Sequence, residues 1–164
     1  MIQVTRLTRF VCLAVLFLCA CEGTRPAPDA VTVAAPKRVP TVVFVTDKGE
    51  VPVVVDVAKT PTQREQGLMW VEHMADNRGM VFLMGPERLL TFWMKNTYIP
   101  LDMFFIREDG TIAYIAENTV PHSLDTVGVK EPVLGVLELA GGSAKRLGIR
   151  AGDTVYHRVF RNKD

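Results

Sequence analysis

The sequence predicts a mainly β domain, an antiparallel sandwich or partly closed barrel of about eight strands with two short helices. Short runs rich in Val, aromatic and branched residues recur from residue 41 onward, and turn signals containing Asp and Gly separate several of them. Only two short stretches carry the residues that start and stop helices. The length of 164 residues suits one ordinary domain with additional terminal segments.

The N-terminal segment predicts secretion. Residues 1–20 contain two basic residues, Arg6 and Arg9, and no acid, and an apolar run fills residues 10–20. At about 1.5 Å per residue this run is too short for a bilayer core of roughly 30 Å. A basic start, a short apolar stretch and a small final residue are typical of a signal peptide, which we place at residues 1–20. The alternative is a buried N-terminal helix or an uncleaved anchor.

The LCAC stretch at residues 18–21 resembles a bacterial lipobox, which implies cleavage before Cys21 and attachment of lipid, palmitate included, to that residue. Glu22 stands where an Asp would resemble an inner-membrane retention signal. The expected location is therefore the cell envelope, anchored to the outer membrane and facing the periplasm. Cys12 and Cys19 leave with the signal peptide, which excludes thiol catalysis, iron–sulfur clusters and cysteine-based zinc sites in the mature chain.

Residues 21–40 form the predicted tether. Four of the ten prolines fall in this stretch, which has neither a helical nor a strand period. Pro-rich segments are semi-extended at about 3.1 Å per residue, so the tether reaches on the order of 60 Å. It would hold a single β-rich domain, residues 41–161, away from the lipid surface.

The predicted strands of that domain share Val, aromatic or branched residues in short runs. They lie at residues 42–46, 51–57, 80–84, 90–96, 103–107, 111–117, 133–139 and 154–160. The tripeptides at residues 47–49 (DKG) and 108–110 (EDG) are hairpin signals, because Gly adopts the positive φ that tight turns require.

The two predicted helices are recognised by their ends. Thr60 at the N-cap, Pro61 at the first helical position and Gln63 two residues later form a capping box, which predicts a helix over about residues 61–68. Ser143 is the expected cap of the second helix, and Gly148 its C-terminal stop.

Three stretches together resemble a known family. They are QREQGLM at residues 63–69, FWMKNTYIPLDM at residues 92–103, and VLEL at residues 136–139 followed by the Gly-Ile and Gly-Asp pairs at 148–149 and 152–153. In this order they resemble domain of unknown function family 192, a group of small secreted or lipid-anchored proteins. The resemblance covers about residues 41–161 and implies a mostly β fold, but no activity.

The first candidate binding group is the pair Trp93 and Lys95. Side chains alternate along a strand, so the two share one face if Phe92 and Met94 point into the core. An aromatic ring beside a cation suits a sugar ring, an aromatic group or an anion. The alternative is that Trp93 packs under a loop while Lys95 extends past it to solvent.

Glu138 is the second candidate because it shares a strand face with apolar Val136. Burying an unpaired carboxylate is unfavourable, so it should lie at the strand end or have a cationic partner. Arg64 and Lys95 are the natural partners, and we favour a structural ion pair over a catalytic acid. We expect Arg64, Trp93, Lys95 and Glu138 to gather in one region.

Asn96 and Asp102 complete the candidate patch. Asp102 opens a predicted strand directly after Pro100-Leu101, where a carboxylate commonly accepts backbone N–H groups instead. The amide of Asn96 would serve the same loop from its other end.

Other catalytic and metal-binding patterns are missing from the sequence. The three histidines, His73, His122 and His157, are scattered, and GGSAK at residues 141–145 matches neither a nucleophile elbow nor a phosphate-binding loop. Six methionines would suit Cu(I), but their apolar surroundings favour core packing; they are Met69, Met74, Met80, Met84, Met94 and Met103. We therefore expect no metal and no cofactor.

The net charge of +1 excludes a polybasic nucleic-acid binder. The leading hypothesis is a non-enzymatic, lipid-anchored module whose polar-aromatic patch binds a glycan, a peptide or an envelope protein. The alternative is an envelope hydrolase or transferase that uses Glu138 or Asp102 as acid/base. Two carboxylates about 5–9 Å apart in a concave site would favour that alternative.

Overall fold

The computed structural model describes residues 41–157 and residue 160. The predicted signal peptide, the predicted lipidation site at Cys21 and the predicted tether lie outside these residues. Within the described part of the chain, no helix has the length and apolar character needed to cross a membrane.

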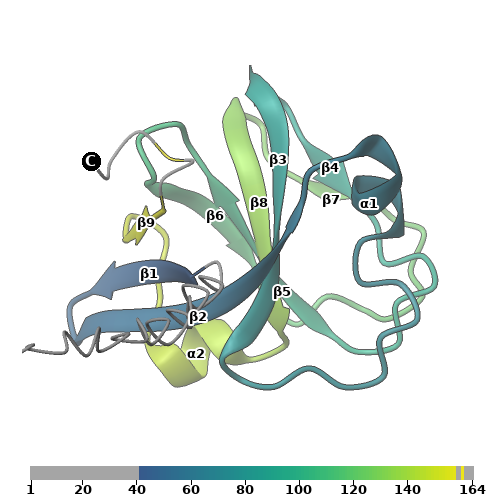
Figure 1. The fold of residues 1–164 in the computed structure, drawn as a ribbon, viewed down its shortest axis with the longest axis horizontal. Helices are drawn as coiled ribbons and strands as arrows, with labels where there is room; N and C mark the ends of the chain where they lie inside the picture. Colours follow the sequence, from purple (N-terminus) through teal and green to yellow (C-terminus); the bar gives the residue numbers. More distant parts are fainter. Residues whose placement is uncertain (1–40, 158–159, 161–164) are drawn as a thin grey trace, which may run out of the picture. The chain divides into compact units, whose positions relative to one another are not determined.

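A curled seven-stranded sheet dominates the fold, in the order β6-β5-β8-β3-β2-β1-β9 (Figure 1). A second sheet pairs β4 with β7. The nine strands of the described residues are β1 (Thr41–Thr46), β2 (Gly49–Ala58), β3 (Arg78–Arg88), β4 (Thr91–Phe92), β5 (Leu101–Ile106), β6 (Ile112–Ala116), β7 (Val127–Gly128), β8 (Val133–Ala140) and β9 (Thr154–Tyr156). The predicted fold class is confirmed.

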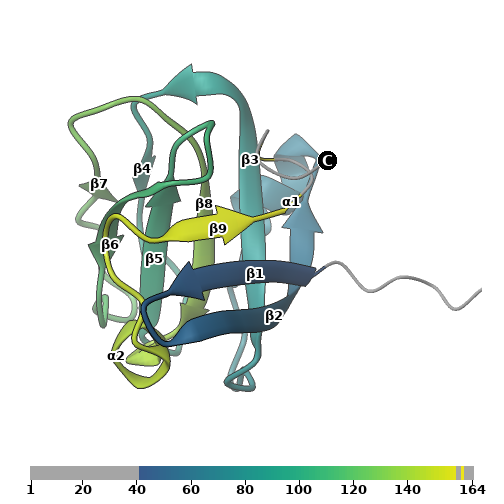
Figure 2. The ribbon, with the colours of Figure 1, turned by 90° about the vertical axis from the view of Figure 1, so that its left-hand side faces the viewer.

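The large sheet curls until its two edges meet. A bridge joins Thr111, just before β6, to Thr154 in β9. Beside it, the Val155 N–H donates to the Gly110 carbonyl at 2.8 Å. Figure 2 shows β1, β2 and β9 running across the direction of β5 and β8, which is the geometry of a partly closed barrel.

One pair of strands differs from the antiparallel prediction. β2 and β3 are parallel, in register from Val54 opposite Arg78 to Ala58 opposite Phe82. Parallel neighbours cannot be joined by a tight hairpin, so the chain must cross over. It does so through helix α1 (Pro61–Gln66) and the loop that follows. All other strand pairs among the described residues are antiparallel.

The curled sheet buries both of its faces. Neighbouring residues of β5 and β8 alternate between two apolar clusters: Phe104 and Leu137 belong to the first, Phe105 and Val136 to the second. All six residues of β5 are buried. The alternation places Glu138 on the same face of β8 as Val136, within the interior.

Helix α1 begins as predicted. The Gln63 N–H donates to the Thr60 hydroxyl at 3.2 Å, and the Gln63 side-chain oxygen accepts the Thr60 N–H at 3.0 Å. The helix ends at Gly67, which has a φ of 47°. Because glycine has no Cβ atom, the backbone can approach the Phe82 ring closely at this position.

Helix α2 (Ser143–Leu147) ends at Gly148 as predicted, but its start differs. Gly142 is the N-cap residue, and no side chain of the helix itself caps it. The Asp102 carboxylate of β5 takes that role, accepting the N–H groups of Gly142 at 3.1 Å and Ala144 at 2.8 Å. The prediction of Ser143 as cap was wrong because the acceptor comes from a distant strand.

The strand predicted at residues 90–96 is also shorter than expected. β4 ends at Phe92, and a turn follows in which the Thr97 N–H donates to the Met94 carbonyl at 3.1 Å. Asn96 adopts a left-handed φ of 55°, which a strand cannot accommodate. The last strand ends at Tyr156, and β7 was not predicted.

Candidate functional site

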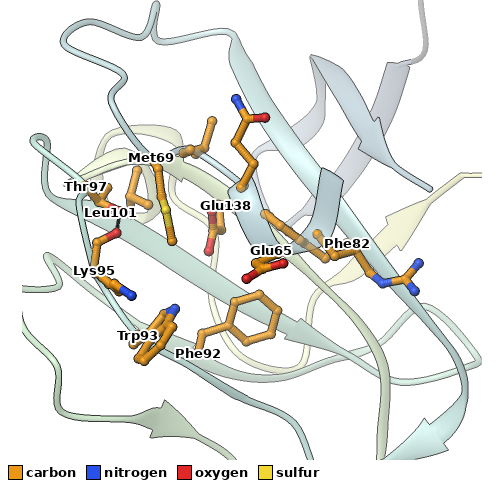
Figure 3. A pocket seen from close by; sticks show the side chains of 13 residues that line it. Glu65, Met69, Phe82, Phe92, Trp93, Lys95, Thr97, Leu101 and Glu138 are labelled. Atoms are coloured by element: carbon orange, nitrogen blue, oxygen red, sulfur yellow. Dashed lines mark hydrogen bonds between the residues drawn. The ribbon is translucent and has the colours of Figure 1, made fainter. Parts of the chain in front are cut away.

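A small cavity lies between α1 with its following loop and the segment after β4, over the face of β8 that carries Glu138. We call it the inner pocket; its volume is about 50 Å³. Figure 3 shows the Glu138 and Glu65 carboxyl groups directed into one space, with Lys95 and Trp93 across from them. The lining residues are Arg64, Glu65, Gln66, Gly67, Leu68, Met69, Phe82, Phe92, Trp93, Lys95, Thr97, Leu101 and Glu138.

A wider depression, the outer hollow, adjoins the inner pocket. Its volume is about 440 Å³, and it is lined by Thr62, Glu65, Gln66, Met69, Trp70, Trp93, Lys95 and Asn96. Five of these residues also line the inner pocket, so the two cavities share a wall and form one site. Both tryptophans of the chain belong to the outer hollow.

Glu138 is the most unusual group of the site. Its side chain is buried, with 4% of its surface exposed, between Met80 of β3 and Met103 of β5 in the strand register. No described residue hydrogen-bonds or forms an ion pair with its carboxyl group. Burial raises its pKa to about 8, because the interior solvates a charge poorly. The carboxyl group is therefore mainly protonated at neutral pH, and the predicted ion pair was wrong.

The two cations that were expected to pair with Glu138 bind elsewhere. Arg64 lines the inner pocket, but its Nη1 donates to the Lys59 carbonyl at 2.8 Å and the Leu83 carbonyl at 3.5 Å. The Lys95 Nζ atom lies 5.1 Å from the centre of the Trp93 ring, in a cation–π contact.

Trp93 and Lys95 therefore form the pair that strand alternation predicted, although the strand itself ends at Phe92. Trp93 is 47% exposed, which leaves ring surface free for a ligand. Phe92 was predicted to point into the core, but its side chain also lines the inner pocket.

The two remaining candidates separate. Asn96 lies in the outer hollow, where its side-chain amide contacts the Met69 sulfur at 3.8 Å. Asp102 lines neither cavity: besides capping α2, its carboxylate accepts the Asn118 N–H at 2.8 Å. Asp102 thus joins a strand, a loop and a helix, and its place in the predicted patch was wrong.

Sequence reasoning missed Glu65, Met69 and Trp70. Glu65 and Met69 lie in the QREQGLM stretch, so their position beside Arg64 was the available signal. Trp70 is 57% exposed with a φ of 68°, and its N–H donates to the Asn96 carbonyl at 2.8 Å. A positive φ at a tryptophan depends on this contact and leaves no trace in the sequence.

The site offers no metal-binding cluster. Among residues 41–157 and 160, no three His, Cys, Asp or Glu side chains are placed to hold an ion. Its chemistry consists of one neutral buried acid, one exposed carboxylate, two cations and several aromatic rings. Such a site can stack a ring and hydrogen-bond its substituents.

The fold and site define a small half-barrel β domain with one polar-aromatic pocket. The chain belongs to the family DUF192, described as an uncharacterized ACR, whose model matches residues 43–157. The family resemblance read from the three sequence stretches is thereby confirmed.

Two solved structures share the fold. A protein from Sinorhizobium meliloti 1021, described as a candidate transcription regulator, is 45% identical with a TM-score of 0.72, over 77% of this chain and 98% of its own. A protein of unknown function from Novosphingobium aromaticivorans DSM 12444 is 36% identical with a TM-score of 0.70, over 82% and 99%. Among curated proteins, none matches this chain.

Proposed function

We propose that this protein is a non-enzymatic binding module of the cell envelope that takes a glycan ring in the outer hollow. The observation that carries the proposal is the exposed Trp93 ring, held beside Lys95 at the entrance to a pocket. Trp70 lines the same hollow, so two aromatic side chains face one ligand. Peptides and partner proteins are the other outcomes that the test below separates.

The dimensions and polarity of the hollow support a sugar. Ligand cavities of about 300–1,000 Å³ hold small molecules, and the outer hollow has about 440 Å³. The polar side chains of Glu65, Gln66 and Asn96 surround the aromatic rings. A sugar ring presents a C–H face to an aromatic ring and hydroxyl groups around its edge, which this arrangement complements.

The alternative, an acid/base hydrolase or transferase, has one observation in its favour. Glu138 and Glu65 line the same pocket in different environments, and such pairs divide acid and base roles in many enzymes. However, the inner pocket has only about 50 Å³, which is too little for a glycosidic bond with both of its rings. Asp102 is occupied by three backbone N–H groups, which leaves it a structural role.

Envelope anchoring through Cys21 is part of the same proposal and is supported by the N-terminal sequence. Cys21→Ser should prevent lipidation, so the protein would leave the membrane fraction or stay unprocessed. Equal membrane fractionation of the variant and the wild type would contradict the anchor. The near balance of 19 basic and 18 acidic residues argues against a nucleic-acid-binding role of the kind that the description of the Sinorhizobium protein suggests.

Intrinsic fluorescence provides a direct binding test, because both tryptophans line the hollow. Soluble oligosaccharides should change the emission of the wild type on titration, without release of shorter products. Trp93→Ala should weaken binding about fivefold, since an aromatic contact contributes about 1 kcal/mol.

Tyr114→Ala is the matched control, because Tyr114 is 45% exposed on β6 and lines neither cavity of the site. It should bind like the wild type. Absence of binding to any oligosaccharide contradicts the glycan proposal, and product release would establish the enzymatic alternative.

A further inference from the structure

The lining of the inner pocket includes a buried polar group that a sugar ring in the outer hollow would not contact. Apolar side chains, including Phe82, Phe92 and Leu101, make up about half of its lining, and the carboxyl group of Glu138 is a buried polar group with which no described residue forms a hydrogen bond. A buried polar group without a hydrogen-bond partner is unfavourable. A ligand group that hydrogen-bonds to Glu138 would remove that penalty.

The volume of the pocket limits what can enter. About 50 Å³ of cavity corresponds to roughly three to five water-sized groups, since one water needs about 10–15 Å³. A sugar ring is excluded, but a substituent of about that many heavy atoms fits. The ring itself would stay in the outer hollow, with one substituent pointing inward.

The charges of the pocket favour a neutral substituent. Arg64 and Lys95 line it as well as Glu65, so a cationic group would meet two positive side chains. An anionic group would be repelled by the Glu65 carboxylate, while the two cations that could attract it are already engaged, Arg64 by two carbonyl groups and Lys95 by the Trp93 ring. A neutral group avoids both repulsions.

We propose that the inner pocket binds the acetamido group of an N-acetylated sugar, whose carbonyl accepts a hydrogen bond from the carboxyl O–H of Glu138 and whose N–H donates a hydrogen bond to Glu65. This inference rests on the proposed glycan-binding function. The acetamido methyl group would pack on the apolar walls. Glu65 is suited to the second contact because it lines both cavities, at the passage between the ring and its substituent.

The protonation states match these roles. Glu138 is buried and donates while protonated, whereas Glu65 is exposed and accepts as a carboxylate. The groups that face Glu138 from the surrounding elements are Arg64 and Glu65 of α1, Lys95 after β4, and the methionines of β3 and β5, of which only the first three carry charge. Above pH 8, Glu138 should ionise and lose its donor, so affinity should fall.

The experiment compares two soluble ligands of identical linkage. Chito-oligosaccharides carry an acetamido group on each ring where cello-oligosaccharides carry a hydroxyl group. At pH 6.5, tryptophan fluorescence titration should give at least tenfold tighter binding of the chito-oligosaccharide, since only its acetamido group can form both hydrogen bonds in the inner pocket. The preference should shrink at pH 9.5.

Variants of Glu138 test the assignment. Glu138→Met keeps the side-chain length among the neighbouring methionines but removes the donor, so it should abolish the preference. Glu138→Gln supplies an N–H donor at every pH and should remove the alkaline loss. Glu50→Met is the matched control, because Glu50 is exposed on β2 and lines neither cavity. Circular dichroism confirms folding of each variant.

The outcomes separate this inference from the proposed function. Equal binding of both oligosaccharides, or a preference that survives Glu138→Met, overturns the acetamido assignment and leaves glycan binding intact. Failure of both oligosaccharides to bind overturns the two proposals together.

Discussion

Two buried carboxyl groups on neighbouring strands have opposite surroundings. Asp102 of β5 and Glu138 of β8 differ by one position in register, since Asp102 lies opposite Leu139 and Glu138 opposite Met103. Asp102 accepts three backbone N–H groups, whereas Glu138 receives no hydrogen bond from the described residues and faces a cavity. A buried acid with all its donors supports the fold, and one without donors is available to a ligand.

The largest expected effect is the pH dependence that Glu138 confers on stability. Its folded pKa of about 8 lies above the ordinary value of 4.5, so the folded state binds the proton more tightly. This tighter proton binding stabilises the folded state fully below pH 4.5. The stabilisation is lost as pH rises to 8, and the free energy of unfolding should fall by roughly 5 kcal/mol over that range.

Urea unfolding of the wild type and Glu138→Met between pH 4.5 and pH 9 measures this slope. The free energy of unfolding of the variant should not fall with pH in this way, and the variant should be the more stable protein at pH 9. Parallel profiles would mean that Glu138 titrates normally and that its pocket does not differ from the surroundings of Asp102.

The next effect concerns Asp102. Asp102→Ala leaves three backbone N–H groups without their acceptor, two of them at the start of α2. We expect a loss of about 4 kcal/mol in the free energy of unfolding at pH 7, because charged hydrogen bonds contribute about 1.5–3 kcal/mol each and are not additive.

Asp153→Ala is the control for this measurement, since the Asp153 carboxylate accepts the single N–H of Arg150 near the surface. It should lose about 1 kcal/mol. If Asp102→Ala and Asp153→Ala lowered the free energy of unfolding by the same small amount, Asp102 would not be the structural carboxyl group that the comparison with Glu138 requires.

The smallest expected effect concerns the N-terminal caps of the two helices, one of which is provided by Asp102. The cap of α1 is local, from Thr60, whereas the cap of α2 comes from Asp102 on a distant strand. Thr60→Ala should lose about 1 kcal/mol, the usual contribution of an N-cap side chain. Thr62→Ala, two residues later and without such a bond, should be near neutral in the same denaturation assay. A larger loss for Thr60→Ala than for Asp102→Ala would reverse our ranking of local and distant contacts.

Several features could be predicted because neighbouring residues determine them. Short runs of Val, aromatic and branched residues located most of the strands, the capping box located the start of α1, and Gly148 located the end of α2. The pairing of Trp93 with Lys95 was predicted from strand alternation and is present, although the strand ends at Phe92 and Lys95 lies in the turn that follows.

The remaining features depended on which elements meet. Glu138 was expected to have a cationic partner, but carbonyl groups of Lys59 and Leu83 hold Arg64, and the Trp93 ring holds Lys95. Likewise, the crossover that makes β2 and β3 parallel follows from the packing of α1, which periodicity does not encode.

The sequence alone therefore determined the β class, the start of α1, the end of α2, the family and the residues from which a site could be built. Those features depend on periodicity and hydrogen bonds within a few residues. Only the tertiary structure decided that Asp102 supports the fold while Glu138 lies unpaired in a pocket. The partner of a buried polar group is set by distances between elements far apart in the chain, and such distances exist only after the sheet has curled.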